Sequence, residues 1–385
     1  MRVTLFAHVQ PGSNPYIALL QQAVQPYCEA PVRIQPRFTL GWVLQTGKAG
    51  GIAHIHWIES HLRPQPWFRP EASGYHAVVN RLGNNRISHP MRATGLLVKL
   101  AGALALARQA GVRLVYTVHN LTAHYHVNSY YIPLERLANR LVFSMADAVH
   151  VHSRYAAGEV ARLYGRARNV LVAPHGNYCG WYPNTLSRAE ARLALDLPED
   201  VFVYLFLGQI APYKGLGDLI EAFLAVDDPS ARLVIAGVVV RADYGARIAT
   251  LIRHPRVLYQ PGYVPDENVQ IYLNAADVVA LPYRRITTSG SALLAFSFGR
   301  PVVAPLSGGL PEIVPASAGL LYDPEEQGAL SAALHRARSV FWSSQAILSH
   351  ARQFDWRVVG PQIAHIYQAA LRSAEAAVSS QEARS

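Results

Sequence analysis

Residues 208–216 read Gly208-Gln209-Ile210-Ala211-Pro212-Tyr213-Lys214-Gly215-Leu216. They follow an apolar run at 201–207 that is typical of a buried strand, and they precede a helical pattern at 217–224. Gly208 permits a sharp turn of the backbone, and Gly215 opens the helix with unpaired N–H groups. Lys214 places an ammonium where an anion would bind. A plain strand-to-helix turn with a solvated lysine fits these residues equally well, so the surrounding sequence has to decide.

Short apolar runs alternate with helical patterns on both sides of this segment. In the first half we expect strands at 3–7, 52–56, 114–118, 148–152 and 170–173, and helices that include 15–24 and 95–110. In the second half we expect strands at 201–207, 232–236, 257–259, 278–281, 301–304 and 319–321, with helices between them. This alternation is typical of βαβ units with parallel sheets. We therefore predict an α/β protein with two doubly wound, Rossmann-like domains that face a cleft.

The composition excludes several classes of protein. Hydrophobic residues make up 51% of the chain and charged residues 16%, which rules out a disordered chain. A net charge of +10 favours an anionic partner: nucleic acid, an acidic membrane surface or a phosphorylated substrate. The arginines are dispersed and no zinc-ligand or RNA-binding signature is present, which disfavours nucleic acid. The two cysteines, Cys28 and Cys179, form no motif, which suits a reducing cytoplasm.

A second strand-to-helix segment, at 281–291, offers more polar groups than a turn requires. Its hydroxyl-bearing residues and glycine are Thr287, Thr288, Ser289, Gly290 and Ser291. Hydroxyls and free amides at a helix N-terminus form a natural cradle for a diphosphate, and Arg284 would add positive charge. Simple N-capping by Ser289 or Ser291 needs only one hydroxyl, so we favour the diphosphate interpretation. Further along the chain, Glu312 would receive a ribose or sugar hydroxyl, or would cap the turn that follows.

Taken in order, three segments resemble the C-terminal half of GT-B fold glycosyltransferases of the group 1 class. They are the Lys-Gly segment at 208–215, Gly-Arg-Pro-Val-Val-Ala at 299–304 and Gly-Gly-Leu-Pro-Glu at 308–312. The resemblance implies an acceptor-binding domain at 1–180 and a domain at 190–350 that binds a nucleotide-sugar donor. It also implies that a helix within 351–385 crosses back to the first domain, before a tail that we expect to fray. The donor would be a GDP- or UDP-linked sugar, and no other cofactor is implied.

Two features depart from the pattern of retaining members of this class. Those members carry two glutamates separated by seven residues, where this chain has Ile286 and Leu294, and they carry an arginine where this chain has Gln209. The differences favour an inverting, metal-independent enzyme, similar to the β-mannosyl- or β-glucuronosyltransferases that build bacterial exopolysaccharides on lipid carriers. A retaining glycosyltransferase of the same fold and a sugar-nucleotide epimerase are the alternatives.

Histidines gather where the strands of the first half are expected to end, at 54–56, 119–124, 150–152 and 175. The carboxyl ends of parallel strands share one edge of a sheet, so these clusters would face the cleft. An inverting transfer needs a base for the acceptor hydroxyl, and the candidates are His119, Glu59 and His124. In the resembled class, the histidine at the position of His119 faces the transferred sugar. The histidines lack zinc-ligand spacing, so we expect no metal site.

Aromatic and basic residues are interleaved at 61–92, which suits an acceptor loop, a membrane-surface patch or a solvated insertion. The run at 94–110 includes Lys99 and Arg108, so we do not expect it to span a membrane. We expect a saccharide acceptor, including a lipid-linked one, and an enzyme in the cytoplasm or at the cytoplasmic face of the membrane. A third hypothesis, a basic nucleic-acid-binding module, would require salt-dependent DNA binding without sugar-nucleotide binding.

Overall fold

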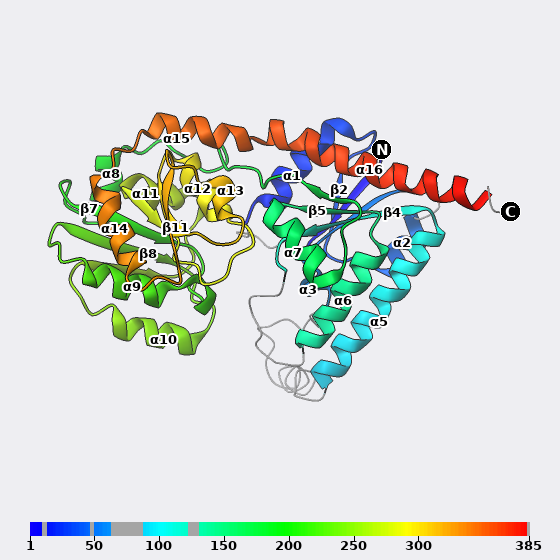
Figure 1. The fold of residues 1–385 in the computed structure, drawn as a ribbon, viewed down its shortest axis with the longest axis horizontal. Helices are drawn as coiled ribbons and strands as arrows, with labels where there is room; N and C mark the ends of the chain where they lie inside the picture. Colours follow the sequence, from blue (N-terminus) through cyan, green and yellow to red (C-terminus); the bar gives the residue numbers. More distant parts are fainter. Residues whose placement is uncertain (10–13, 47–49, 63–87, 122–130, 383–385) are drawn as a thin grey trace. The chain divides into compact units, whose positions relative to one another are not determined.

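The computed structural model describes residues 1–9, 14–46, 50–62, 88–121 and 131–382 (Figure 1). The chain forms two compact units. The first unit comprises Met1–Ala173 and Gly360–Ser385, and the second unit comprises Pro174–Val359. Each contains a six-stranded parallel sheet with helices, which confirms the predicted α/β fold class. The domain boundaries given above stay a prediction.

The sheet of the first unit has the order β2-β1-β3-β4-β5-β6, and all its neighbouring strands run parallel. The strands are β1 (Val3–Phe6), β2 (Arg33–Gln35), β3 (Gly51–His56), β4 (Val112–Val118), β5 (Ala148–Val151) and β6 (Val170–Val172). The chain runs from β1 outward to the edge strand β2 and then returns to the other side of β1. The strand order therefore reverses between β1 and β3, and at such a switch point the loops that leave neighbouring strands diverge and open a crevice.

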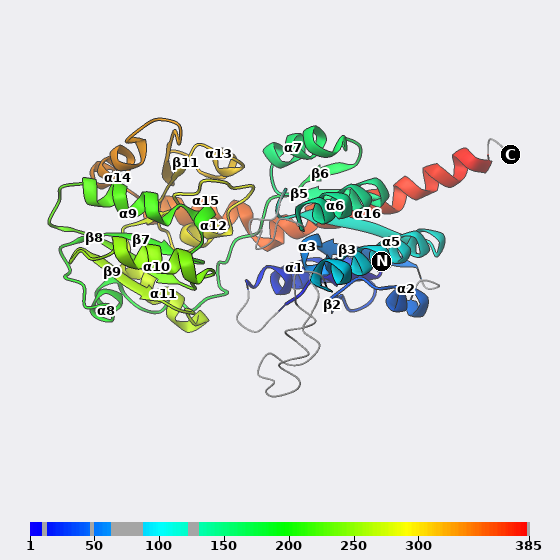
Figure 2. The same cartoon turned by 90° about the horizontal axis from the view of Figure 1, so that it is seen from below.

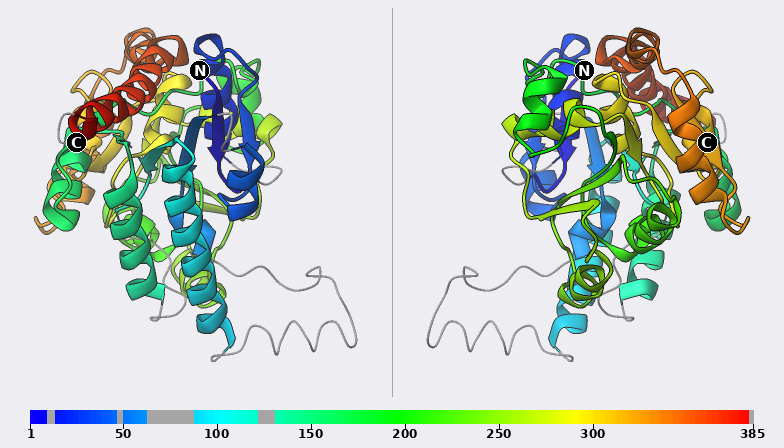
Figure 3. Two further views of the ribbon diagram at one scale, coloured as in Figure 1. Left: turned by 90° about the vertical axis from the view of Figure 1, so that its right-hand side faces the viewer. Right: turned by 90° about the vertical axis from the view of Figure 1, so that its left-hand side faces the viewer.

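One face of this sheet is apolar and is covered by several helices. They include α2 (Leu40–Thr46), α3 (Ile58–Leu62), α5 (Ser88–Gln109), α6 (Tyr131–Met145) and α7 (Arg154–Tyr164). Helices α5 and α6 lie side by side (Figure 2, Figure 3). The stretch Pro90–Gln109 of α5 is long and apolar enough to cross a membrane by length and composition, with a mean hydropathy of 1.3. Leu97, Leu100 and Leu104 of this stretch are buried in the core of the first unit.

The opposite face of the first sheet is polar toward the carboxyl ends of its strands. The register aligns His56 with Thr117 and Thr117 with His150, so the three side chains leave the same face. This face is covered by α1 (Tyr16–Val24) and by the C-terminal part of α16 (Trp356–Glu382), which lie on the other side of the sheet from α5 and α6 (Figure 1). The first unit therefore has an aliphatic layer on one side of its sheet and a layer of histidines on the other.

The sheet of the second unit has the order β12-β11-β10-β7-β8-β9 and is also parallel throughout its neighbouring pairs. The strands are β7 (Phe202–Leu207), β8 (Ala231–Gly237), β9 (Val257–Pro261), β10 (Val278–Ala280), β11 (Val302–Pro305) and β12 (Gly319–Tyr322). The helices include α8 (Arg188–Leu193), α9 (Leu216–Ala225), α10 (Ala242–Leu251), α11 (Val269–Ala275), α12 (Gly290–Ser297), α13 (Leu310–Ile313), α14 (Ala329–Ser339) and α15 (Ser344–Ala351). The strand order reverses between β7 and β10, which places a second switch point there.

The predicted strands all form, with ends that shift by one or two residues, but several short elements had no clear sequence signal. Examples are the three-residue edge strand β2 and the seven-residue helix α2. At the C-terminus we expected the chain to fray after about Ser373, whereas α16 continues to Glu382. The residues after Ser373 are rich in alanine and glutamate, which are strong helix formers and extend a helix that packing has already nucleated.

Two glycines let the ends of β7 and β8 approach each other. Gly237 has a φ of +142°, and a Cβ at this position would lie 1.8 Å from the carbonyl oxygen of Gly208. Gly208, with a φ of +137°, donates its N–H to Ala236 in the same turn. The first glycine of the Lys-Gly segment is therefore fixed by β8 as well as by its own loop.

We expect Gly237→Ala to destabilise the second unit far more than Gly262→Ala. Gly262 has nearly the same φ, +146°, but a Cβ there would meet nothing within 4 Å. The strained φ costs either variant about 1–3 kcal/mol, so the difference between them isolates the contact with Gly208. Urea unfolding of both variants measures it, and equal losses would contradict the close-approach explanation.

Candidate active site

The histidine-rich face of the first sheet contains a continuous chain of hydrogen bonds, which we call the histidine chain. The Tyr367 hydroxyl lies 2.8 Å from Nδ1 of His54, and Nε2 of His54 lies 2.6 Å from the Thr117 hydroxyl. That hydroxyl lies 2.9 Å from Nδ1 of His150, whose Nε2 lies 2.9 Å from the carbonyl oxygen of Ala173. All four side chains are fully buried.

The end of the histidine chain determines the direction of its hydrogen bonds. A carbonyl oxygen only accepts, so Nε2 of His150 donates to Ala173 and Nδ1 of His150 accepts from Thr117. Thr117 in turn accepts from Nε2 of His54, and Tyr367 donates to Nδ1 of His54. Both imidazoles are neutral in this arrangement, and burial lowers the pKa of His54 well below its ordinary value. The histidine chain is therefore a satisfied structural network, and it cannot pass a proton beyond a carbonyl.

A second group of rings, which we call the ring cluster, lies beside the histidine chain at the switch point between β1 and β3. Nδ1 of His56 lies 3.0 Å from Nε2 of His119, and the Trp57 ring stacks on His119 at 3.9 Å with an angle of 13°. Tyr16, at the start of α1, meets the rings of His56, His119 and His152 edge-on. The predicted gathering of histidines at the strand ends is thus realised for β3, β4 and β5. His175 belongs to the second unit.

The three candidate bases lie in different parts of the first half of the chain. His119 is buried within the ring cluster. Glu59 lies in the first turn of α3, as expected for an acid that supports a helix start. Burial raises the pKa of Tyr116 well above its ordinary value and the charge of Glu59 adds to this shift, so Glu59 is near the aliphatic side of the sheet. His124 lies outside the described residues, as does 63–87 of the basic and aromatic segment. The described residues contain no group of three His, Cys, Asp or Glu that could hold a metal ion.

In the second unit, Lys214 lies at the switch point between β7 and β10. Its ammonium is 4.2 Å from the centre of the Tyr283 ring and 5.3 Å from the centre of the Tyr213 ring. No carboxylate of a described residue forms an ion pair with it. Burial lowers the pKa of Lys214, but Tyr283 and Tyr213 more than offset this effect and the pKa lies above its ordinary value. Lys214 is therefore a half-buried cation held by two aromatic rings.

The loop after β10 packs directly on the Lys-Gly segment. A Cβ on Gly215, whose φ is +70°, would lie 1.8 Å from the carbonyl oxygen of Pro282, and the N–H of Arg284 donates to the carbonyl of Tyr213 over 3.0 Å. The position of Lys214 between two tyrosine rings was not evident from the sequence. The signals that could have indicated it are Tyr213, next to Lys214, and Tyr283, which follows the neighbouring strand β10.

The Arg284 side chain has a carboxylate partner. Its Nε and Nη2 donate to both oxygens of Asp218, at 2.6 and 2.5 Å, in a bidentate pair at the surface. The pair lines a cavity of about 410 Å³ between α9 and α14. The prediction that Arg284 adds charge to a diphosphate site remains a prediction, and a ligand would have to compete with Asp218 for this guanidinium.

The hydroxyls of the loop at 287–291 differ in their hydrogen bonding. Ser289 is the N-cap of α12 and accepts from the N–H of Ala292 over 3.1 Å. The hydroxyls of Thr287, Thr288 and Ser291 make no hydrogen bond to a described residue. The carbonyl of Thr287 accepts from Gly309, which ties this loop to the next Gly loop. Three hydroxyls therefore remain for a ligand beside the start of α12.

The first residue of α12 is in contact with the segment that follows β6. A Cβ on Gly290 would lie 2.8 Å from the Tyr178 hydroxyl and 3.5 Å from Nε2 of His175. Nδ1 of His175 donates to the carbonyl of Gly176 over 2.6 Å, so Nε2 presents a lone pair. Burial lowers the pKa of His175 to about 4. His175 is thus a neutral acceptor next to this helix N-terminus, and it does not contribute a positive charge for an anion.

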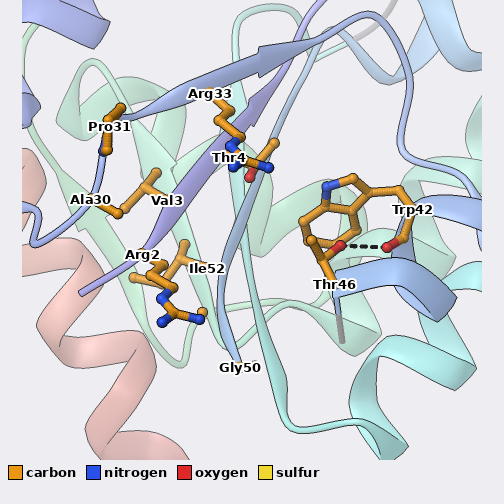
Figure 4. Close-up of a pocket in the computed structure, with 11 residues that line it drawn as sticks. Arg2, Val3, Thr4, Ala30, Pro31, Arg33, Trp42, Thr46, Gly50 and Ile52 are labelled. Carbon is orange, nitrogen blue, oxygen red and sulfur yellow. Dashed lines mark hydrogen bonds between the residues drawn. The ribbon is translucent and has the colours of Figure 1, made fainter. Parts of the chain in front are cut away.

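Two predicted residues remain. Gly208 directly follows β7, and Glu312 is exposed in the first turn of α13. A cavity of about 310 Å³ in the first unit is lined by residues that include Arg2, Arg33 and Trp42 (Figure 4). It lies at the amino ends of β1 and β3, the edge opposite to the ring cluster, and is therefore separate from the candidate site.

Two protein-family models match the chain. The family model described as "Glycosyl transferases group 1" matches residues 201–339, which include Lys214 and the loops of α12 and α13. The model described as "Glycosyltransferase Family 4" matches residues 95–177, which include His119. The chain belongs to the group 1 glycosyltransferases.

Similar curated proteins come from several bacteria. The D-inositol 3-phosphate glycosyltransferase of Mycolicibacterium smegmatis is 31% identical over 305 residues, which are 74% of this chain and 66% of that relative. The GDP-mannose:glycolipid 4-beta-D-mannosyltransferase of Xanthomonas campestris pv. campestris is 26% identical over 369 residues, 93% of this chain and 90% of that relative. This chain thus spans slightly less than two thirds of the first kind of relative and most of the second.

Solved structures show the same GT-B fold. Anabaena Alr3699/HepE in complex with UDP has a TM-score of 0.68 at 20% identity, covering 95% of this chain and 99% of that one. Sucrose-phosphate synthase from Thermosynechococcus elongatus has a TM-score of 0.59 at 18% identity, covering 100% and 99%. The predicted GT-B architecture of this group 1 glycosyltransferase is therefore confirmed.

The neutral state of His175 predicts a pH dependence of stability. The folded protein keeps this imidazole neutral to about pH 4, whereas the unfolded chain protonates it near 6.5. Between these values the unfolded state binds more protons, so the free energy of unfolding falls as the pH falls from 6.5 toward 4. At pH 5 the loss from this one group is about 2 kcal/mol.

We expect His175→Gln to reduce the pH dependence by that amount, because glutamine does not titrate. Urea unfolding at pH 7.5 and pH 5 measures the difference, and His335→Gln, at an exposed histidine, is the control. An identical pH dependence in His175→Gln and the natural protein would show that His175 is not held neutral by burial.

Proposed function

We propose that the chain transfers a hexosyl or uronosyl group from a nucleoside diphosphate sugar to a saccharide acceptor, with inversion and without a metal ion. The observation that carries this proposal is the position of Lys214. It is a cation without a carboxylate partner among the described residues, and it sits at the switch point where ligands of doubly wound folds bind. The start of α12 lies at the same edge of this sheet, next to three hydroxyls that make no hydrogen bond to a described residue.

These groups match the charge that develops in the reaction. As the bond between the sugar C1 and the diphosphate breaks, negative charge accumulates on the leaving group. Lys214 would neutralise it, and Thr287, Thr288 and Ser291 would donate hydrogen bonds to its oxygens, assisted by the amides of α12. In this scheme a lysine and a helix N-terminus take the role that a divalent cation has in other transferases. Glu312 and Gly208 would lie beside the nucleoside.

The absence of paired carboxylates supports inversion. Ile286 and Leu294 stand where retaining members of the class have glutamates, so no acid at these positions can stabilise a retained configuration. A single displacement instead requires the acceptor to attack from the face opposite to the diphosphate, with a base to take its proton. Two candidates for that base are Glu59 and His124, and His119 is the third.

The acceptor and the cellular location are inferred from relatives and charge. The Xanthomonas campestris relative is named for β-mannosyl transfer to a glycolipid, and the Anabaena structure contains UDP. Together with the net charge of +10, this supports a saccharide acceptor on a lipid and an enzyme at the cytoplasmic face of a membrane. Retention, epimerisation and nucleic-acid binding are the rival functions.

Lys214→Met should weaken the binding of a nucleoside diphosphate at least tenfold, or about 1.4 kcal/mol, because it removes the cation that faces the diphosphate. Calorimetric titration with UDP, GDP and their sugars measures the change. Lys99→Met, an exposed lysine on α5 of the first unit, is the charge-matched control. If no nucleotide bound the natural protein, or if both variants bound equally well, the donor-site proposal would be refuted.

The product should carry the anomeric configuration opposite to that of the donor. Proton NMR of the reaction, recorded before mutarotation or on a glycosidic product, reports the configuration from the coupling of the anomeric proton. A product with the donor's configuration would instead support the retaining alternative, and donor turnover without any acceptor would support the epimerase.

A further inference from the structure

Two contacts fix the ring of His119 in space. In the plane of the ring, its Nε2 is hydrogen-bonded to Nδ1 of His56 at 3.0 Å. Above the plane, Trp57 stacks on it at 3.9 Å, nearly parallel. Trp57 achieves this position with a φ of +46°, a left-handed conformation that a bulky residue rarely adopts. Strained residues of this kind persist where the surrounding structure requires them, and they cluster at functional sites.

The surroundings of His56 indicate which ring carries the shared proton. His56 is fully buried, and its Nε2 has no hydrogen-bond partner among the described residues. If His119 donated to Nδ1 of His56, the proton of neutral His56 would lie on Nε2 as a buried N–H without an acceptor. If His56 donates, only a lone pair is left unpaired. Buried N–H groups without an acceptor are the rarer of the two, so the donor is Nδ1 of His56.

We propose that His56 is a positioning residue that holds His119 in the tautomer with its proton on Nδ1. In this tautomer the proton of His119 lies on Nδ1, and the only lone pair of the ring, on Nε2, is engaged by His56. His119 is then a hydrogen-bond donor and not the base that takes the acceptor proton. The role in catalysis rests on the proposed function, whereas the tautomer does not.

The tautomer can be observed directly by NMR. In the full chain labelled with ¹⁵N at the histidine rings, long-range ¹H–¹⁵N correlations distinguish the two neutral forms, and His119→Gln assigns the signals. We expect the Nδ1–H form for His119, which is not the form that a free histidine side chain prefers. A Nε2–H form in the natural protein would overturn the proposal, irrespective of any activity.

Two variants of His56 test its role. His56→Leu removes the donor at similar volume, so His119 should shift toward the Nε2–H form and kcat should fall about tenfold or more. His56→Asn places an amide near the former Nδ1, and it should restore the Nδ1–H form and most of the activity. If His56→Leu and His56→Asn lost the Nδ1–H form of His119 and the activity to the same extent, the positioning role would be contradicted. Full activity of His56→Leu would contradict it as well.

Thr117→Val is the control, because it breaks the neighbouring histidine chain but removes neither partner of the hydrogen bond between His56 and His119. It should lower stability and leave the His119 tautomer and kcat unchanged. Binding of UDP and GDP sugars is measured in parallel. If the natural protein binds none of them, the proposed function fails while the tautomer result still stands.

Discussion

In both units every neighbouring pair of described strands runs parallel, and the consequences for the site are large. Parallel strands bring all their carboxyl ends to one edge, and the reversal of strand order leaves a gap between two of the loops there. In the first unit the gap lies between β1 and β3, where Tyr16 and Trp57 meet. In the second unit it lies between β7 and β10, where Lys214 meets Tyr283. In each unit the strand order thus determines which side chains come together at this edge.

The two edges differ in the charge of the side chains that they hold. The polar face of the first unit is buried, where a charged imidazole is costly, so the pKa values of His54 and His56 lie well below the ordinary value. The hydrogen bonds of the histidine chain run in one direction, to the carbonyl of Ala173. At this edge of the second unit, the ammonium of Lys214 lies against aromatic rings and not against a carboxylate of a described residue. A carboxylate partner would have cancelled the charge, as Asp218 does for Arg284. Rings stabilise the ammonium and leave its charge available to an anion.

The sequence predicted the sheets, the Lys-Gly segment and the gathering of histidines, because each depends on local pattern and on the rule for parallel strands. It could not predict pairs that the fold brings together from distant positions. Arg284 and Asp218 are 66 residues apart, and His54 meets Tyr367 across 313 residues. The capping role of Ser289 and the free hydroxyls of Thr287 and Ser291 likewise depend on where α12 begins, which composition fixes only to within a residue or two.

The apolar residues Ile286 and Leu294 have a further consequence for the proposed mechanism. Ile286 and Leu294 are half-buried and apolar, and His175 beside Gly290 is neutral, so none of these three residues carries a negative charge that would repel a diphosphate. In the proposed reaction such a site would favour departure of the leaving group, and neither position would offer the sugar cation a carboxylate. In the proposed inverting reaction the acceptor would supply the electron pair from the opposite face, and a base would take its proton. This requirement, together with an engaged lone pair on His119, directs the search for that base to Glu59 and to His124.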